Sequence, residues 1–257
     1  MTNTGKYGAA LLSAEELEAE LRQVGHHRYH IHHPFHRLMV DGKLTKGQLQ
    51  AWALNRYCYQ SAIPRKDAII LSRSDDRQFR ATWRERLVDH DGEEGGEGGI
   101  ERWIKLATGL GLDEIEVVSG DYALPVTHFA VGAYLELVSK CSLLEAVASS
   151  LTEMFSPAII TERVSAMLAK YDYIDEQVLA YFKPRLTQAP RDANFALNYV
   201  VLHADTQQKQ RAAVQALELK CNILWTMLDG LYYSYVAPGF VPPGAFIATD
   251  QPDGPSQ

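Results

Sequence analysis

The feature that most constrains the fold is the recurrence of helix start signals in a chain without strand-type alternation. Ser13-Ala14-Glu15-Glu16 and Thr45-Lys46-Gly47-Gln48 are capping boxes, in which the first and fourth residues satisfy each other's backbone amides. Apolar residues at helical spacing follow the second box, including Leu49, Trp52 and Tyr57. No long segment alternates apolar and polar residues as a half-buried strand would. The sequence therefore predicts an all-α protein.

We expect a bundle of about seven long helices with short connections. Residues 127–155 carry apolar side chains on most helical faces, which predicts one long, central, buried helix. Residues 92–99 are acidic and glycine-rich and predict a solvated loop. The helical segments expected from the pattern are 13–25, 34–39, 45–70 with a kink or interruption at Pro64, 75–90, 100–110, 127–155, 157–171, 174–185, 192–203 and 206–236.

The chain predicts one globular domain with two short flanking segments. Its 257 residues are 46% hydrophobic, which suffices for one sizeable core. The domain is expected over residues 13–236, after a flexible N-terminus at residues 1–12. Residues 237–257 are rich in Pro and Gly and predict a C-terminal arm on the surface or disordered.

Charge and cysteine content exclude several classes of protein. The net charge of −7 provides no basic field for nucleic acid. We find no apolar run of the ~18 residues that a membrane span needs, and no apolar core of a signal peptide. The three cysteines contain no Cys-x-x-Cys pair, so neither a disulfide framework nor a thiolate zinc site is expected. The predicted compartment is the cytoplasm.

Six of the nine histidines lie within residues 26–36. Histidine is the commonest metal ligand and also exchanges protons near neutral pH, so a metal site and a proton-transfer site are both candidates. The chain contains neither the Glu-x-x-His motif of di-iron bundles nor the His-Glu-x-x-His motif of metalloproteases. The segment also lacks Asp and Glu. We therefore predict no tightly bound metal, while heme on an axial histidine stays open.

Three pairs of polar residues stand four apart on predicted helices, so that both members of each pair share a helix face. Each pair has apolar or aromatic neighbours. One such pair alone is typical of a half-exposed structural contact. Three pairs on three helices favour a shared pocket inside the bundle. The pairs are Arg56 and Gln60, Arg86 and His90, and Tyr181 and Arg185.

Further candidates are polar residues in apolar surroundings. Glu153 needs a partner if it is buried, and a structural ion pair would provide one. Instead of a functional role, Lys220 could pack its methylene stem in the core and extend its amine to solvent. Tyr134 could simply be a packed core residue. Cys58 and Cys141 show no paired base that would activate them as nucleophiles.

Five longer motifs resemble the pyrroloquinoline quinone synthase family over roughly residues 13–236. They are Tyr29-His30-Ile31-His32-His33-Pro34-Phe35-His36, residues 53–68 from Ala53 to Ala68, Asp89-His90-Asp91-Gly92, residues 149–155 from Ser149 to Phe155, and residues 186–192 from Leu186 to Asp192.

The resemblance implies a fold and an activity. The fold is a heme-oxygenase-like bundle of seven helices that binds no heme, assembled as a homodimer. The activity is the last step of pyrroloquinoline quinone (PQQ) biosynthesis. In that step the third ring of a bicyclic tricarboxylate hexahydroquinoline (AHQQ) is closed and oxidised by O2, with release of H2O2. No metal or organic cofactor is required.

The resemblance also implies roles for individual residues. Charge neutralisation of a polycarboxylate falls mainly to Arg and Lys side chains, because guanidinium binds carboxylate in a planar, bidentate manner. His30 and His90 are the candidate bases, and His90, Tyr181 and Arg185 match the site for oxygen or peroxide. The remaining positions that match the substrate pocket are Tyr29, Arg56, Gln60, Lys66, Arg86, Tyr134, Glu153, Arg163 and Lys220.

One position departs from the family pattern. Ile160 stands where some members carry a histidine, so one proton-transfer group is missing or a neighbour replaces it. Within the histidine-rich segment, the resemblance assigns Tyr29 and His30 to the pocket. We expect His32, His33 and His36 to cap and pack the turn at Pro34, and His26 and His27 to be exposed.

Other function classes remain as alternatives to the oxidase. A carrier that binds the quinone or its precursor would use the same cations. A metal-dependent oxygenase of the same bundle shape is a third possibility, and a thiaminase-like hydrolase that uses an activated cysteine is a fourth. Some relatives are fused to a small peptide-binding domain, which makes such a protein of the PQQ pathway a candidate partner.

Overall fold

The computed structural model describes residues 10–94 and 96–250, which form helices and no strand. Seven helices are eleven residues or longer, which confirms the all-α bundle expected from the sequence. These seven are α1 (Ala14–Arg28), α3 (Lys46–Ser72), α6 (Gly99–Gly109), α8 (Pro125–Lys140), α10 (Ser156–Lys170), α11 (Phe182–His203) and α12 (Gln207–Tyr235). The shorter elements are α2 (Pro34–Val40), α4 (Arg77–Trp83), α5 (Glu85–Asp91), α7 (Glu114–Ser119), α9 (Leu143–Ser149) and the 3-10 helices η1 (His30–His32) and η2 (Ser150–Phe155).

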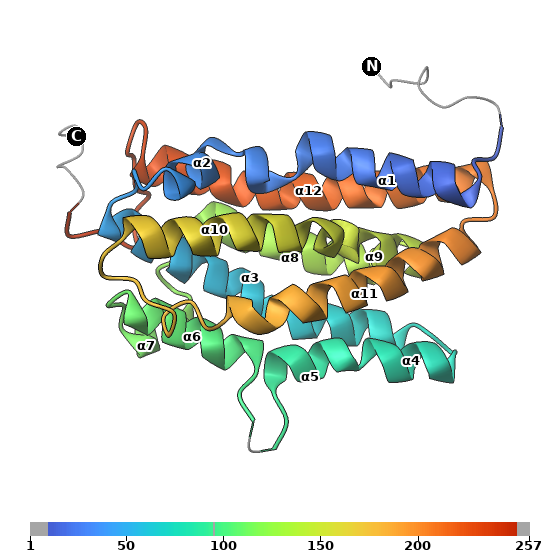
Figure 1. The fold of residues 1–257 in the computed structure, drawn as a ribbon, viewed down its shortest axis with the longest axis horizontal. Coiled ribbons are helices and arrows are strands. Elements are labelled where there is room, and N and C mark those ends of the chain that lie inside the picture. Colours follow the sequence, from blue (N-terminus) through green and yellow to red (C-terminus); the bar gives the residue numbers. More distant parts are fainter. Residues whose placement is uncertain (1–9, 95, 251–257) are drawn as a thin grey trace.

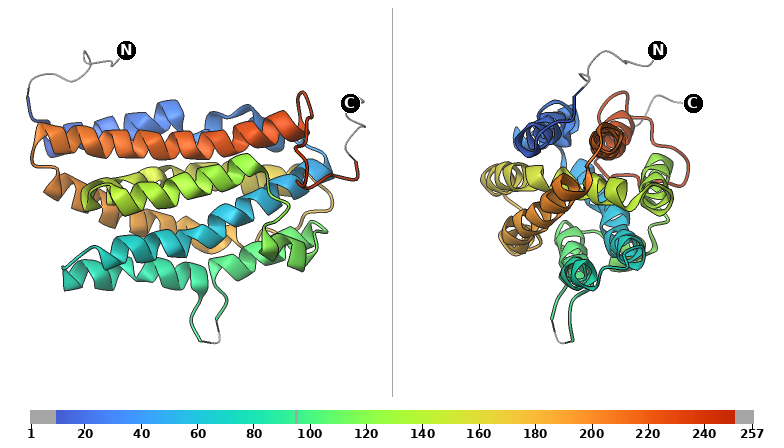
Figure 2. Two further views of the ribbon diagram at one scale, coloured as in Figure 1. Left: turned by 180° about the vertical axis from the view of Figure 1, so that it is seen from behind. Right: turned by 90° about the vertical axis from the view of Figure 1, so that its right-hand side faces the viewer.

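The helices lie lengthwise in an elongated bundle (Figure 1). Helices α1 and α12, from opposite ends of the chain, run side by side, and α12 also packs on α8 and α9. Helix α3 packs against α8 on one side and α5 and α6 on another. The view along the bundle shows the helices grouped around a shared interior (Figure 2). Side chains from most of the chain can therefore meet in one place.

The capping boxes at Ser13 and Thr45 begin α1 and α3 as expected. Three predictions about helix length are wrong. The single helix expected over residues 75–90 is divided at Arg84 into α4 and α5. The single helix expected over residues 127–155 is divided into α8, α9 and η2. A third capping box explains the break between α8 and α9, because the side chains of Ser142 and Glu145 accept each other's backbone amides and start a new helix.

The opposite error occurs near Pro190. Two helices were expected at 174–185 and 192–203, but α11 continues from Phe182 to His203 through Pro190, after turns at 171–181. Pro64 likewise lies inside an uninterrupted α3. Proline removes one hydrogen bond, and tertiary packing on both faces of these helices outweighs that loss.

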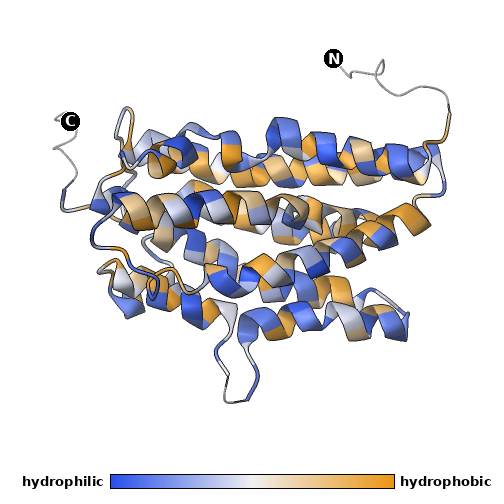
Figure 3. Ribbon diagram, in the orientation of Figure 1, coloured by the Kyte–Doolittle hydropathy of each residue, from blue (hydrophilic) through white to orange (hydrophobic). Residues whose placement is uncertain are grey.

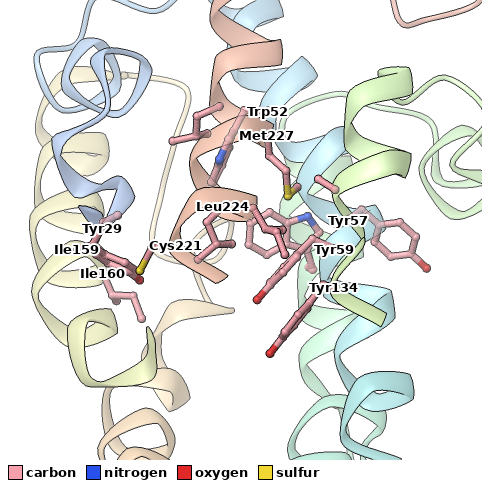
Figure 4. Close-up of a cluster of buried hydrophobic side chains, with 14 of the residues drawn as sticks. Tyr29, Trp52, Tyr57, Tyr59, Tyr134, Ile159, Ile160, Cys221, Leu224 and Met227 are labelled. Atoms are coloured by element: carbon pink, nitrogen blue, oxygen red, sulfur yellow. The ribbon is translucent and has the colours of Figure 1, made fainter. Parts of the chain in front are cut away.

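Hydrophilic and hydrophobic residues form separate stripes along the outer helices (Figure 3). The apolar stripes enclose one continuous core that includes the fully buried Trp83, Trp103 and Phe35. Leu224 of α12 lies between two groups of side chains (Figure 4). Tyr59 and Tyr134 form one group, and Tyr29, Ile159 and Ile160 belong to the other.

The expectation that no apolar run reaches the length of a membrane span is corrected for one segment. Leu143–Lys170 contains an 18-residue window with a mean hydropathy of 1.3, and half of that window is buried inside the molecule. The segment is bent into α9, η2 and α10, and its apolar side chains contribute to the core of the bundle. Length and composition alone make it a candidate, which is weak evidence for a span.

Both flanking segments contact the bundle where the structure describes them. Leu12 exchanges two hydrogen bonds with the side chain of Gln210, of 3.0 and 2.9 Å, while residues 1–9 of the expected flexible N-terminus lie outside the described residues. In the C-terminal arm, the backbone carbonyl of Phe246 accepts a bond from the Tyr235 hydroxyl at 2.7 Å. The Asp250 carboxylate accepts one from Gly47 N at 2.9 Å. Residues 251–257 of the arm are outside the described part.

Candidate active site

A polar cavity lies inside the bundle, between η1, α3, α8, η2, α10 and α11. Eleven of the thirteen site residues predicted from the sequence line it. The other two, Arg86 and Lys220, lie one layer behind and contact lining residues. The eleven are Tyr29, His30, Arg56, Gln60, Lys66, His90, Tyr134, Glu153, Arg163, Tyr181 and Arg185. The structure thus brings together most of the residues that the family resemblance implies, and their chemical roles stay predictions.

Helix α3 supplies one wall of the cavity through a single stripe of side chains. Arg56, Tyr59, Gln60, Ile63 and Lys66 all line the cavity, and each is three or four positions from another member of the set. Positions three and four apart lie on one face of a helix, so the α-helical repeat aligns these five groups. Tyr59 was not among the predicted residues, although its position three residues after Arg56 could have indicated it.

Glu153 of η2 holds two of the arginines. Its Oε2 lies 2.8 Å from Arg86 Nη1 and its Oε1 lies 3.4 Å from Arg185 Nη2. Behind them, Arg86 Nη2 donates to the backbone carbonyl of Asp192 at 2.9 Å. The Trp83 ring covers the Arg86 guanidinium at 4.1 Å. Both guanidinium groups are therefore fixed by partners from η2 and α11.

Three other basic side chains of the site have no carboxylate within 4.0 Å among the residues that the structure describes: Arg56, Arg163 and Lys220. Burial, and then the charge of Arg56, lower the pKa of Arg163 to about 10. The Nε atom of Arg163 is buried without a hydrogen-bond partner. A buried cation without a counter-ion costs several kcal/mol, on the order of the penalty for desolvating one ion. The site is therefore electrostatically incomplete without an anion.

Lys66 differs from these three because a carboxylate accompanies it. Its Nζ lies 2.6 Å from Asp67 Oδ1 and 3.4 Å from the Ser150 hydroxyl, and both members of the ion pair are buried. Although burial acts against the charged form, Asp67 raises the pKa of Lys66. Lys66 therefore faces the cavity as an ammonium group.

His90 presents an unprotonated nitrogen. Its Nδ1 lies 2.9 Å from the backbone carbonyl of Arg86 on the same helix. A carbonyl oxygen only accepts, so Nδ1 carries the proton and Nε2 keeps its lone pair. Burial, and then the neighbouring Arg185 cation, lower the pKa of His90 to about 3. The imidazole is therefore neutral at physiological pH, with a lone pair at Nε2.

His30 is also neutral. Its side chain is buried, and its Nδ1 has no hydrogen-bond partner. Burial and then the Arg56 and Arg163 cations lower its pKa well below the usual value. Its ring makes an edge contact with Tyr29, with centroids 4.3 Å apart. Tyr29 and His30 thus form a second polar corner of the cavity.

The other histidines of the cluster follow the expectation in part. His33 caps α2, because its Nδ1 accepts from Phe35 N at 3.0 Å, and its Nε2 contacts Asp229 at 3.1 Å. His36 is buried and lies 3.1 Å from Glu162. His26 and His27 are exposed as predicted, whereas His32 is exposed rather than packed against the turn. The parts of the chain that the structure describes contain no group of three or more potential metal ligands.

Aromatic rings form the apolar walls. Tyr59 and Tyr134 are stacked, with centroids 6.2 Å apart and planes 9° apart. Trp103 meets Tyr181 edge to face at 4.8 Å. Ile160, which is 6% exposed, completes the wall where some relatives are expected to carry histidine. Flat walls, surplus cations and neutral imidazoles together suit a planar, polyanionic ligand from which protons are removed.

A family model described as "TENA/THI-4/PQQC family" matches residues 18–230. A pyrroloquinoline-quinone synthase from Acidiphilium cryptum is 63% identical over 236 residues, covering 92% of this chain and 96% of the relative. The chain belongs to this family. A second relative, the bifunctional coenzyme PQQ synthesis protein C/D of Methylorubrum extorquens, is 62% identical over 92% of this chain, which spans 63% of that relative.

Solved structures of low sequence identity share the fold. A domain of unknown function with a heme oxygenase-like fold from Shewanella denitrificans matches with a TM-score of 0.73 at 15% identity, covering 93% of this chain and all of that one. A TenA homologue from Pseudomonas syringae matches with a TM-score of 0.68 at 14% identity, covering 90% of this chain and all of the homologue. At such identities the likeness concerns the fold alone.

Proposed function

We propose that this protein catalyses the last step of PQQ biosynthesis as an oxidase without cofactor. The relatives named pyrroloquinoline-quinone synthase support a role as an enzyme of that pathway. The observation that carries the finer proposal is that one aromatic cavity contains two arginines without carboxylate partners, Arg56 and Arg163, and two neutral imidazoles. This combination fits a planar polycarboxylate that loses protons during the reaction.

In the proposed reaction, the carboxylates of the bicyclic precursor bind Arg56 and Arg163, the cations that lack counter-ions. Paired charge-assisted hydrogen bonds to guanidinium fix the ring system in one orientation. His30 and His90 then accept protons from ring carbon or nitrogen atoms, because both imidazoles are neutral. The third ring closes within the bound precursor.

The oxidation takes place beside His90, Tyr181 and Arg185. The Arg185 guanidinium lies within 3.4 Å of Glu153 and so stays charged and fixed. A fixed cation stabilises superoxide or peroxide as negative charge develops. The electron-rich reduced ring system supplies the electrons to O2 directly, and H2O2 leaves. No metal or organic cofactor takes part in this scheme.

A carrier is the second candidate, and Ile160 favours it. Ile160 occupies a pocket position where a proton-transfer group is expected, while the cations that would bind the ligand are kept. Single-turnover spectra separate the two functions. The oxidase converts one equivalent of bound precursor to the absorbance of PQQ when O2 is admitted, whereas a carrier leaves the absorbance of the bound precursor unchanged in air.

We also propose that the protein is a cytoplasmic homodimer that cooperates with a small peptide-binding protein of the pathway. The relative named C/D combines two PQQ synthesis functions in one chain, which supports such a partner. Light scattering of the purified protein tests the dimer, because a monomeric mass of 28.8 kDa at micromolar concentration contradicts it.

A further inference from the structure

Lys220 occupies an unusual position for a lysine. It lies in the middle of α12, and its side chain is completely buried, so its amine does not reach solvent as its sequence context had allowed. Its Nζ lies 2.6 Å from the Tyr59 hydroxyl. The same nitrogen lies 3.3 Å from the centroid of the Tyr134 ring. One phenol oxygen and two aromatic faces thus make up its immediate polar surroundings.

The charged and titratable groups around Lys220 offer little support for an ammonium ion. Burial and then Arg56 and Lys66 of α3 lower its pKa well below the usual value, and the opposing effects of Cys221 and Glu153 are smaller than these. His30 of η1 is neutral. The other titratable groups that face it are Tyr59 of α3, Tyr134 of α8 and the neighbouring Cys221 on α12 itself.

Lys66 is an internal comparison for this argument. Both lysines are buried in the same site, but Lys66 has Asp67 at 2.6 Å and Lys220 has no carboxylate within 4.0 Å among the described residues. The pKa of Lys66 is raised and that of Lys220 is lowered. A lysine that loses its charge on burial becomes a base, which is the usual way in which enzymes obtain a basic amine.

We propose that Tyr59 and Lys220 form a proton relay, in which Lys220 is an uncharged amine that receives a substrate proton through Tyr59. Tyr59 lines the cavity, whereas Lys220 lies behind it. In this relay the uncharged amine accepts the phenol O–H of Tyr59, and the phenol oxygen keeps its own lone pairs for the substrate proton. The relay rests on the proposed function, because the substrate proton comes from the bound precursor.

The transfer balances without any further reactant. A C–H or N–H proton of the precursor moves to Tyr59 Oη as the hydroxyl proton of Tyr59 moves to Lys220 Nζ. The electron pair of the broken bond stays on the precursor and is delocalised into its ring carbonyls. Lys220 becomes an ammonium ion, and this new positive charge lies close to the carboxylates that have just bound.

The first test reads the charge of Lys220 without any ligand. Lysine labelled with ¹³C at Cε gives separate resonances for amine and ammonium forms, and the Lys220→Met variant identifies the resonance of Lys220. We expect an amine resonance for Lys220 and an ammonium resonance for Lys66 at pH 7.5. An ammonium resonance for Lys220 overturns the proposal, whether or not the protein turns over precursor.

The second test separates proton transfer from charge neutralisation, with PQQ as the binding probe. Loss of an uncharged amine leaves the Kd for PQQ of Lys220→Met within about tenfold, the size of one neutral hydrogen bond. Saturated turnover falls about 100-fold or more, the usual contribution of an acid-base group. Tyr59→Phe keeps the ring and removes the relay oxygen. This variant is likewise expected to lose turnover while it keeps its affinity for PQQ.

Loss of PQQ binding with turnover retained contradicts the relay. Lys220 is a counter-charge if its variant binds PQQ about 100-fold more weakly while turnover at saturating precursor is unchanged. Lys66→Met, which removes a paired ammonium from the same cavity, is the matched control and is expected to weaken PQQ binding. Failure of wild-type protein to convert precursor refutes the proposed function instead, and the NMR result then still decides the charge of Lys220.

Discussion

Replacing His90 by alanine tests the assignment of this residue as a base. The imidazole Nδ1 is occupied by the carbonyl of Arg86 at 2.9 Å, and burial keeps the ring neutral, so the variant loses a proton acceptor but no charge. A general base contributes about 10² to 10⁴-fold to a rate, which corresponds to roughly 2.7–5.5 kcal/mol of barrier. Removal of one neutral hydrogen bond costs about 0.5–1.5 kcal/mol of binding. We therefore expect a large fall in turnover with PQQ affinity reduced at most about tenfold.

The assay measures turnover of the late precursor in air and, separately, the Kd for PQQ. His203 provides a matched control, because its Nδ1 also contacts the carbonyl four residues earlier, that of Tyr199, at 2.8 Å. His203 is exposed and lies away from the cavity, so His203→Ala is expected to behave as wild type. His90→Asn, which can still donate to the Arg86 carbonyl, separates loss of the base from loss of this local bond.

Two outcomes would refute this reasoning. Turnover of His90→Ala equal to that of wild type at saturating precursor would show that His90 accepts no proton in the slow step. A loss of PQQ binding of about 100-fold with unchanged turnover would assign His90 to ligand binding. In both cases, a melting temperature close to that of wild type establishes that the variant is folded.

Three further predictions follow from the buried groups. His90 has a pKa of about 3 in the folded protein, against the usual 6.5 for histidine in an unfolded chain. The unfolded chain therefore binds more protons between these pH values, and the free energy of unfolding falls as the pH decreases from 6.5. This group contributes a slope of up to about 1.4 kcal/mol per pH unit, which denaturant titrations of His90→Ala should lack, and parallel curves for variant and wild type would contradict it. Arg163→Met removes a buried cation without a counter-ion and is expected to stabilise the ligand-free protein by about 1–3 kcal/mol while weakening PQQ binding. Arg191→Met is the control, because it removes a partner of three carboxylates and should not stabilise the protein. Alkylation of Cys141, whose pKa is raised by burial, should leave turnover intact, and inactivation by this modification would favour a cysteine-dependent hydrolase.

Regular spacing predicted the helical class and three pairs of pocket residues, whereas the rest of the pocket was expected from the resemblance to the family. Arg56 and Gln60 share a face of α3 however that helix packs in the fold, and the capping box at Thr45 determines where the helix begins. Where local signals conflicted with packing, prediction failed, as at Pro190, which α11 incorporates. The capping box at Ser142 was present in the sequence and indicated a new helix start, but it lies inside a long apolar run that favoured one continuous helix.

The states of the site residues could not be predicted, because they depend on contacts between distant segments. Lys220 and Tyr59 are 161 positions apart, and only the folded chain shows that the amine is buried against a phenol. Glu153 was expected to need a partner, but its selection of Arg86 and Arg185 follows from how η2 packs on α11. Helical spacing therefore indicates which residues share a face of one helix, and tertiary structure determines which faces meet and how their groups are charged.

The most direct measurement of the central claim is aerobic turnover of the late precursor by protein that has been dialysed against a strong chelator and assayed for bound metal. The account predicts that metal-free protein converts precursor to PQQ in air, that H2O2 is formed, and that PQQ formation stops when O2 is removed. Absence of conversion by folded, metal-free protein, with activity restored in proportion to added iron, would contradict it and identify a metal-dependent oxygenase.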